Sequence, residues 1–312
     1  MMAKGLVVKS TGSWYKIRQA DYSIIDARIK GKIRLKSINT TNPVAVGDWV
    51  DYELESSGDE TYAVITQINN RHNYIIRKSN NLSKQAQIIA SNLDLALLVV
   101  TLSSPRTSLG FIDRFLVMAG AYHIPVTLVF NKCDIYTNED FQQFEALKGL
   151  YESLGYPCLM CSTVDPAYEP NSVLLTILEH KTTLISGHSG VGKSSILNQL
   201  LPLAKQKTNT ISSQHQKGKH TTTFAEMFFI NDDSALIDTP GIRDFGIIDL
   251  EKTEIGHYFP EIRQYMPTCK FNDCTHQNEP ECGVYKAFQS GTIAGSRYYN
   301  YLSILDNQDI YE

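Results

Sequence analysis

TTLISGHSGVGKSSILNQLL, residues 182–201, is the stretch that decides the fold of the central part of the chain. An apolar run predicts a short strand, a glycine-rich centre predicts a loop, and the last residues predict a helix. Together they form the context of a phosphate-binding loop of the G-x-x-x-x-G-K-S type. Backbone N–H groups of such a loop can surround a β-phosphate, and the helix N-terminus adds a favourable dipole. The stretch therefore predicts a P-loop nucleotide-binding domain of the α/β class.

Side chains of this loop have different expected roles. Lys193 should neutralise the β- and γ-phosphates, and the Ser194 hydroxyl should bind Mg²⁺. The other loop residues expected to bind the nucleotide are Gly187, His188, Ser189, Gly190, Val191, Gly192 and Ser195.

A second phosphate-sensing element follows downstream. Asp238 directly follows the apolar run SALI and is the first residue of the sequence D-T-P-G. At the end of a strand its carboxylate can hold Mg²⁺ through water, and the Gly241 amide can sense the γ-phosphate. Between the two motifs lies KGKHTTTFAEMFF, a polar segment where a switch loop belongs. One of its threonines should complete the Mg²⁺ shell when the γ-phosphate is present, and Thr222 is favoured over Thr223.

The sequence NKCD, residues 131–134, follows an apolar strand upstream of the P-loop. The Asp134 carboxylate can accept hydrogen bonds from guanine N1–H and N2–H₂, a donor pair that adenine lacks. Asn131 can contact the purine edge and brace the P-loop, and the stem of Lys132 can cover the base plane. Ser162, in the segment CST after the next strand, should support the guanine through backbone contacts. These residues predict GTP and GDP as ligands.

The order of the motifs is that of an ordinary GTPase cut and rejoined, with the base reader ahead of the P-loop. Circular permutation is physically reasonable, because domain termini often lie close together at the surface. From about residue 88, apolar runs alternate with helical stretches, which predicts a mostly parallel sheet covered on both faces. Since D-T-P-G leads straight into the C-terminal segment, nucleotide state is expected to reach that segment directly.

Residues 1–75 contain about five short strand-like runs, which fits a small barrel of the OB type. The first 78 residues hold 12 Lys and Arg against 8 Asp and Glu, whereas the remaining chain has a net charge of −8. Residues 27–36, ARIKGKIRLK, place five cations on one face of a strand. A solvated strand face would explain them, but we favour a surface for an RNA phosphate backbone. The five cations are Arg28, Lys30, Lys32, Arg34 and Lys36.

Three cysteines and one histidine stand within fourteen residues of a polar, turn-rich segment. Cys269, Cys274, His276 and Cys282 form a Cys₃His set, which is typical of one structural Zn²⁺ with no open position for catalysis. The alternative is a set of scattered buried cysteines. The C-x-x-C at residues 158–161 is different, because a strand would put its two thiols on opposite faces. We expect both of these to be buried apolar side chains.

Composition and segment lengths place the chain among globular proteins of two or three domains. Of its 312 residues, 42% are hydrophobic and 20% are charged. No apolar run approaches the length of a membrane span, and the first 17 residues lack a signal-peptide core. We expect a cytoplasmic protein that acts as a monomer.

Taken together, these motifs resemble the circularly permuted GTPase family of ribosome small-subunit-dependent GTPase A (RsgA). The resemblance covers nearly the whole chain, from GLVVKSTGSWY and VGDWVDYE to the spacing C-x₄-C-x-H-x₅-C. It implies an OB-fold RNA-binding domain at 1–75, a permuted GTPase domain at 76–245 and a zinc-binding helical domain at 246–312. It also implies slow GTP hydrolysis stimulated by the small (30S) ribosomal subunit, a role in late maturation of that subunit, and contacts to ribosomal RNA.

The group that orients the attacking water is the open question. Many GTPases carry a glutamine just after D-x-x-G, but here the position is Ile242, which offers no polar group. Water must then be oriented by His220 in the switch segment, by a ribosomal group, or by both. We hypothesise that His220 contributes, with Thr222 as the catalytic Mg²⁺ ligand.

Two other functions fit parts of the sequence. A P-loop kinase or ATPase acting on a small metabolite is opposed by NKCD, and competition of GTP against ATP separates the two. An RNA chaperone with a vestigial nucleotide site is opposed by the intact Lys193, Ser194 and Asp238. GTP turnover in the presence of small ribosomal subunits distinguishes that alternative.

Overall fold

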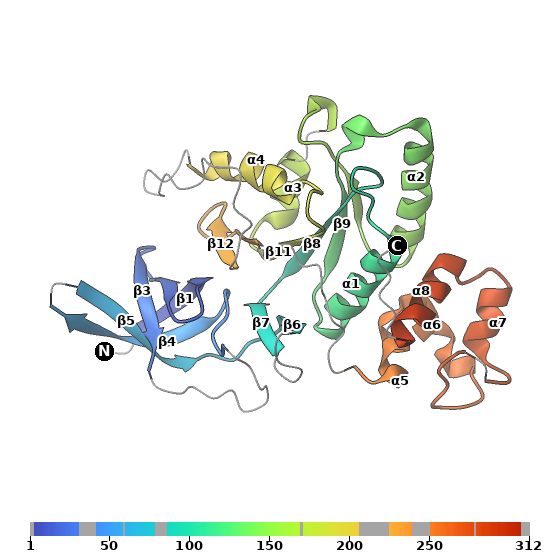
Figure 1. The fold of residues 1–312 in the computed structure, drawn as a ribbon, viewed down its shortest axis with the longest axis horizontal. Helices are drawn as coiled ribbons and strands as arrows, with labels where there is room; N and C mark the ends of the chain where they lie inside the picture. Colours follow the sequence, from blue (N-terminus) through green and yellow to red (C-terminus); the bar gives the residue numbers. More distant parts are fainter. Residues whose placement is uncertain are drawn as a thin grey trace.

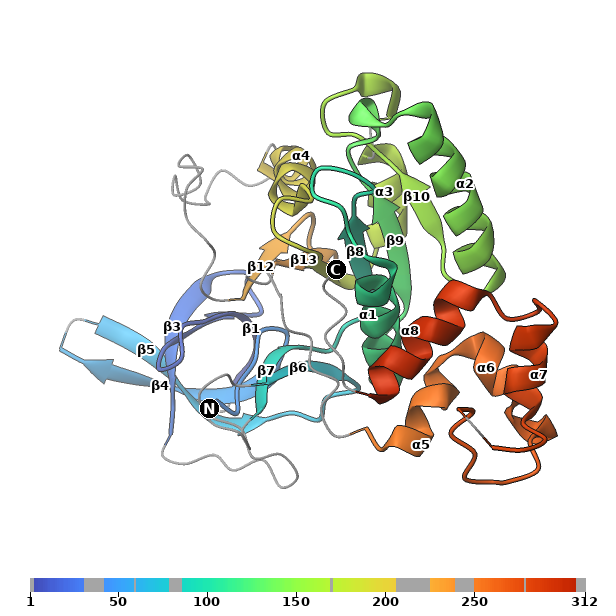
Figure 2. The same ribbon diagram turned by 45° about the vertical axis from the view of Figure 1, so that its right-hand side comes forward.

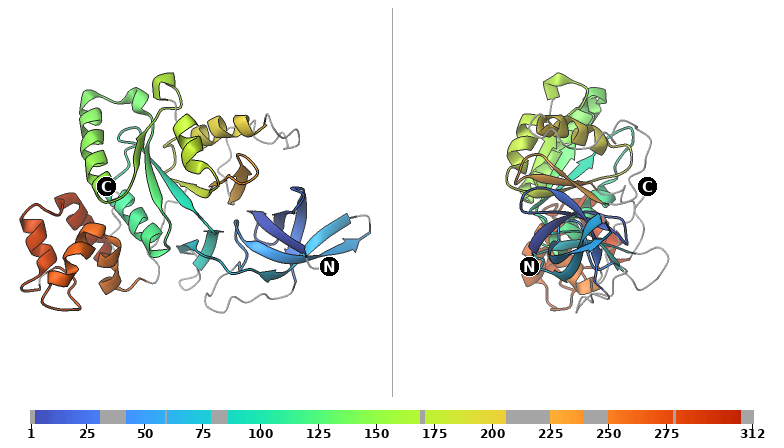
Figure 3. Two further views of the ribbon diagram at one scale, coloured as in Figure 1. Left: turned by 180° about the vertical axis from the view of Figure 1, so that it is seen from behind. Right: turned by 90° about the vertical axis from the view of Figure 1, so that its left-hand side faces the viewer.

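The computed structural model of the chain describes residues 3–30, 42–58, 60–78, 86–168, 171–205, 225–238, 250–277 and 279–306. A β-barrel, a sheet flanked by helices and a group of short helices follow one another from one end of the molecule to the other (Figure 1). The view from behind in Figure 3 places the barrel and the C-terminal helices at opposite ends, with the sheet between them. Within the described ranges, no helix is long and apolar enough to cross a membrane.

The N-terminal part is a closed five-stranded barrel, as predicted. Its hydrogen-bonded order is β1-β2-β3-β5-β4, and β4 pairs back with β1. Strand β3 runs parallel to β5 and the other neighbours are antiparallel. Alternate side chains such as Val7, Ile17 and Tyr52 fill the interior. The strands are β1 Ala3–Ser10, β2 Tyr15–Arg18, β3 Ile24–Ile29, β4 Trp49–Ser57 and β5 Glu60–Ile68.

A two-stranded hairpin, β6 Tyr74–Lys78 and β7 Ala86–Ser91, connects the barrel to the sheet. Beside it, Arg71 forms an ion pair with the fully buried Asp48 at 2.6 Å. The Asp48 carboxylate also accepts a hydrogen bond from the Ser91 hydroxyl at 2.6 Å. These contacts fix the connection between the two parts.

The central sheet has the predicted parallel core. Its order is β10-β9-β8-β11-β13-β12, and only β12 is antiparallel to its neighbour. The strands are β8 Leu95–Val100, β9 Val126–Phe130, β10 Cys158–Met160, β11 Thr182–Ser186, β12 Glu226–Phe229 and β13 Ala235–Asp238.

Helices cover both faces of this sheet. Because successive strand residues point to opposite faces, Leu98 of β8 packs with α1 and α2 whereas Leu97 packs with α3 and α4. This explains why the strand reads as one continuous apolar run. The helices are α1 Leu109–Ala121, α2 Asn138–Ser153, α3 Asn171–Leu178 and α4 Lys193–Lys205.

The barrel attaches to the sheet through β12. Lys9 of β1 lies opposite Glu226 in the strand register, and their side chains form an ion pair at 2.9 Å. The Arg18 guanidinium lies 3.8 Å from the centre of the Phe229 ring and donates to the Asp232 carbonyl at 3.2 Å. The barrel therefore contacts the β12–β13 hairpin, whose first strand ends the predicted switch segment and whose last residue is Asp238.

The C-terminal part is mostly helical, as predicted, and packs against α1 (Figure 2). The buried Arg297 donates to Asp113 of α1 and, at 2.6 Å, to Glu261. Asn300 donates to the same Asp113 carboxylate at 2.6 Å. The elements are α5 Lys252–Ile255, η3 Gly256–Tyr258, α6 Pro260–Tyr265, η4 Met266–Thr268, α7 Gly283–Gln289 and α8 Gly295–Leu305.

The predicted basic strand lies only partly within the described residues. Arg28 of β3 and the following Lys30 are both exposed, with Glu55 and Glu53 of β4 at 3.2 and 3.4 Å. Lys32, Arg34 and Lys36 lie outside the described residues. The two described cations thus have acidic neighbours on β4, which β5 separates from β3 in the barrel, although no acid stands between Ala27 and Gly47 in the sequence.

Candidate nucleotide site and metal centre

The predicted nucleotide residues gather at the carboxyl ends of the parallel strands, the usual ligand-binding edge of an open α/β sheet. Asn131 directly follows β9, Cys161 follows β10, and Gly187 follows β11, while Asp238 is the last residue of β13. The structure therefore brings together motifs that are far apart in the sequence.

Two P-loop glycines occupy positions that exclude any side chain. A Cβ on Gly187, where φ is 143°, would lie 2.2 Å from the carbonyl oxygen of Val99. A Cβ on Gly192, where φ is 100°, would lie 2.2 Å from Nδ2 of Asn131. The loop thus passes tightly against β8 on one side and the base-reading loop on the other.

Asn131 physically joins the base reader to the P-loop. Its side chain is fully buried, and its Nδ2 donates to the Val191 carbonyl at 2.8 Å. The Cys161 thiol lies 3.3 Å from Asn131 Oδ1. The amide is therefore held at both ends, and it braces the P-loop as expected from the sequence.

The Asp134 carboxylate is held by a residue for which sequence reasoning predicted only backbone contacts. Asp134 lies in the short helix η1 Cys133–Ile135 and accepts a hydrogen bond from the Ser162 hydroxyl. The same hydroxyl accepts from the backbone N–H groups of Val164 and Asp165, each at 3.0 Å. Ser162 thus fixes both its own loop and the orientation of the carboxylate.

Lys132 reveals a loop that sequence reasoning missed. It adopts a left-handed backbone conformation with φ of 64°, and its Nζ donates to the Ser104 carbonyl at 2.7 Å. In the same loop, Pro105 lies 3.6 Å from the position of a Cβ on Gly190. The loop after β8 therefore touches both nucleotide motifs, and its sequence carries no motif that could have indicated this.

Lys193 is held inside the P-loop. Its Nζ donates to the carbonyl oxygens of Gly187 and His188 at 2.7 and 2.8 Å. Burial lowers the pKa of Lys193, and the negative charge of Asp238 opposes that shift. Ser194 and Ser195 follow on the exposed first turn of α4.

Other loop residues lie where the motif predicts. Ser189 and Gly190 are exposed at the tip of the loop, and Val191 is fully buried beneath it. The His188 ring packs at a tilt against Phe111 of α1, with 3.8 Å between ring centres. His220, Thr222 and Gly241 lie outside the described residues, as do Thr223 and Ile242.

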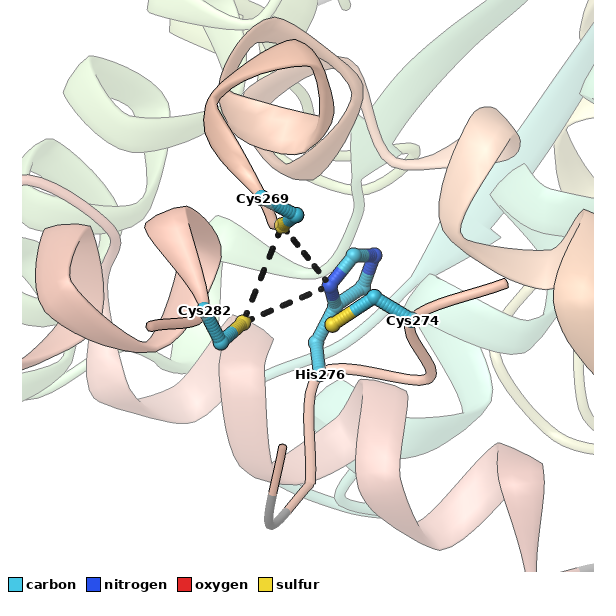
Figure 4. Close-up of side chains that lie close together, drawn as sticks. All are labelled: Cys269, Cys274, His276 and Cys282. Atoms are coloured by element: carbon cyan, nitrogen blue, oxygen red, sulfur yellow. Dashed lines mark hydrogen bonds between the residues drawn. The ribbon is translucent and has the colours of Figure 1, made fainter. Parts of the chain in front are cut away.

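The Cys₃His residues meet in one cluster (Figure 4). The four ligand atoms lie within 4.8 Å of one another. Sγ of Cys269 and Sγ of Cys282 are 3.8 Å apart, and each is 3.5 Å from His276 Nδ1. A tetrahedral zinc site has edges of roughly 3.8 Å between sulfurs and 3.5 Å between sulfur and nitrogen, given its bond lengths. The cluster therefore fits one structural Zn²⁺.

The environment of the cluster also suits a metal. Burial raises the pKa of Cys274 to about 12 and lowers the pKa of His276. Zinc takes thiolates and a neutral imidazole as ligands, so metal binding would release thiol protons. The Tyr298 hydroxyl donates to the His276 carbonyl at 2.6 Å and ties the cluster to α8. Outside the cluster, Cys158 and Cys161 are buried as predicted, and the Cys161 thiol makes in addition the polar contact with Asn131.

The fold and the site together define a circularly permuted P-loop GTPase, in which the base reader precedes the P-loop in sequence and joins it in space. The model of the RsgA GTPase family matches residues 68–248, and that of the RsgA N-terminal domain matches residues 4–62. The chain belongs to the RsgA GTPase family and is an enzyme that hydrolyses GTP.

Similar proteins match over nearly the whole chain. The small ribosomal subunit biogenesis GTPase RsgA 2 of Bacteroides thetaiotaomicron is 51% identical over 98% of this chain and 97% of its own. The small ribosomal subunit biogenesis GTPase RsgA of Flavobacterium psychrophilum is 48% identical over 98% of this chain and 93% of its own. In the crystal structure of YjeQ from Thermotoga maritima, the matched region covers 98% of both chains, with 30% sequence identity and a TM-score of 0.76. YloQ, described as a circularly permuted GTPase, is 28% identical over 100% and 98%, with a TM-score of 0.72.

Proposed function

We propose that this GTPase assists the biogenesis of the small ribosomal subunit, and that binding to the 30S subunit stimulates its GTP hydrolysis. The observation that carries the proposal is about 50% identity, over 98% of the chain, to proteins named small ribosomal subunit biogenesis GTPase RsgA. A late step of maturation, a cytoplasmic location and a monomeric state belong to the same proposal.

Base recognition would depend on the joined loops after β9 and β10. Asp134, oriented by Ser162, would accept the N1–H and N2–H₂ hydrogen bonds of guanine. Asn131 would set the distance between the base and the phosphates through its bond to Val191. The stem of Lys132 would cover the base plane, with its ammonium group anchored on Ser104.

Phosphate binding would use the P-loop and the strand ends beside it. Lys193 would exchange the carbonyl oxygens of Gly187 and His188 for β- and γ-phosphate oxygens. Ser194 and Thr222 would bind Mg²⁺ directly and Asp238 through water, and the ion would neutralise charge on the phosphates. Gly241 would sense the γ-phosphate through its amide, and His220 would orient the attacking water.

Zinc would have a structural role in the C-terminal part. The α-helices described there are four to eleven residues long, too short to be stable alone. Four ligands from Cys269, Cys274, His276 and Cys282 would replace part of a missing core.

An RNA partner is supported by the outer face of the barrel. Trp14, in the β1–β2 connection, is 50% exposed and stands edge-on to Tyr62 of β5, with 6.4 Å between ring centres. The Arg28 guanidinium lies 4.4 Å from the centre of the Tyr62 ring. Strands 2–3 and the adjoining loops of OB folds bind oligonucleotides, and aromatic side chains stack on bases whatever the sequence. Glu55 neutralises part of the charge of Arg28, so stacking would carry more of the affinity than phosphate contacts.

The proposed function is tested by measuring GTP hydrolysis alone, with purified small subunits, and with purified large subunits as the control. We expect a many-fold rise in kcat with small subunits and none with large ones. Equal turnover under all three conditions would refute the proposed function while leaving the GTPase assignment intact.

A further inference from the structure

We infer that Gln199 is a positioning residue for guanine recognition, because it fastens the P-loop helix to the loop that supports the base. The inference rests on the proposed guanine site, and it adds to that site a residue that belongs to none of the nucleotide-binding sequence motifs.

Gln199 lies in α4, the helix that begins at Lys193. Its side chain is half-buried, and its Nε2 donates to the Thr163 carbonyl at 2.9 Å. Thr163 directly follows Ser162, whose hydroxyl donates to Asp134. One side chain of the phosphate-binding helix thus holds the backbone adjacent to the group that orients the guanine-reading carboxylate.

This bond joins the base-binding and phosphate-binding parts at a point different from that of the Asn131 contact. The Asn131 contact is the hydrogen bond to Val191 in the P-loop. The Gln199 bond runs the other way, from the P-loop helix to Thr163 in the support loop. Because these two hydrogen bonds are made at different points, they restrict both the distance between the two parts and the rotation of one part relative to the other. They therefore set the angle at which Asp134 meets a base whose phosphates are fixed on α4.

The contribution of Gln199 to the stability of the fold does not by itself explain why a side-chain amide stands at this position. Gln199 Oε1 is buried and has no hydrogen-bond partner among the described residues. An unsatisfied buried acceptor is costly, which offsets the gain from the single bond that Nε2 makes. Methionine or leucine would occupy a similar volume without that cost. What an apolar side chain cannot supply is the directed contact with Thr163.

The test compares Gln199→Leu, Gln199→Glu and Gln199→Lys with wild type. Leucine removes the donor, glutamate keeps the shape but presents only acceptors to the Thr163 carbonyl, and lysine restores a donor. Asn198→Ala, an exposed change on the same helix, is the matched control. Equilibrium affinity is measured for GDP and for IDP, which lacks the 2-amino group that Asp134 would bind, and thermal unfolding is recorded for every variant.

We expect Gln199→Leu and Gln199→Glu to bind GDP about three- to tenfold more weakly, the range set by one lost hydrogen bond. IDP affinity should fall less, so that the GDP/IDP ratio shrinks, and Gln199→Lys should recover part of it. An unchanged ratio overturns the inference, whether affinities stay at wild-type values or fall equally for both nucleotides. Asp134→Asn is measured in parallel: if it leaves the GDP/IDP ratio unchanged, the guanine site itself is misassigned and the role of Gln199 falls with it.

Discussion

Nδ2 of Asn131 donates a hydrogen bond to the carbonyl oxygen of Val191 at 2.8 Å, across a sequence separation of 60 residues. The donor belongs to the base reader and the acceptor to the P-loop. Removing the donor would leave a buried carbonyl unpaired, so the two motifs stabilise each other. Their inverted order in the chain therefore does not separate them in the fold.

Ser162→Ala should weaken GDP binding about three- to tenfold, because Asp134 and two backbone N–H groups lose one shared hydroxyl. The effect should be smaller than that of changing Asp134 itself. Titration with a fluorescent GDP analogue measures it, and Ser172→Ala on the exposed side of α3 is the control. Wild-type affinity in Ser162→Ala would show that the hydroxyl does not orient the carboxylate.

His220→Ala should lower the kcat of subunit-stimulated GTP hydrolysis about 100-fold with little change in KM, the size expected for a group that handles water in the transition state. The reason is that Ile242 has no polar group for this task. Single-turnover hydrolysis on small subunits is the measurement, and His215→Ala is the control. A wild-type rate in His220→Ala would assign the water to a ribosomal group instead.

Cys282→Ser should reduce bound zinc from one ion per chain to near zero and unfold the C-terminal helices, since a structural zinc site stabilises only the folded form. Zinc per chain is measured by atomic emission and helix content by circular dichroism. Cys158→Ala removes a buried thiol outside the cluster and should keep the zinc. Retention of a full equivalent by Cys282→Ser would contradict the site.

Arg297→Met should destabilise the attachment of the C-terminal helices to α1 by about 3–5 kcal/mol, the usual cost of breaking a buried ion pair. Burial alone would lower the pKa of Arg297, but the neighbouring Asp113 and Glu261 raise it, so the guanidinium stays charged. Without it, two carboxylates remain buried with no cation.

The loss of stability in Arg297→Met is measured by urea unfolding, and Arg263→Met on the exposed side of α6 is the control. Equal midpoints for Arg297→Met and wild type would mean that the pair adds nothing to stability.

The sequence predicted the features that depend on local pattern. The strand, loop and helix around Lys193 were predictable because the motif needs that context, and the barrel was predictable from strand runs bounded by turn residues. The Cys₃His cluster was predictable from ligand types and spacing. In each case, residues close in sequence carry the whole signal.

Contacts between distant segments could not be predicted in the same way. Nothing in the sequence pairs Gln199 with Thr163, or Arg297 with Asp113, because either contact depends on how separate elements pack. The acid beside Arg28 was missed for the same reason, since Glu55 is brought there by strand register.

The central claim, that NKCD reads guanine from its displaced position, is tested most directly by the nucleotide preference of Asp134→Asn. An asparagine offers a donor where guanine N2–H₂ needs an acceptor, whereas xanthine presents a carbonyl oxygen at position 2 that can accept from that donor. We predict that GDP binds at least about 100-fold more weakly and that XDP binds more tightly than it does to wild type. Unchanged GDP affinity, with no gain for XDP, would contradict the account.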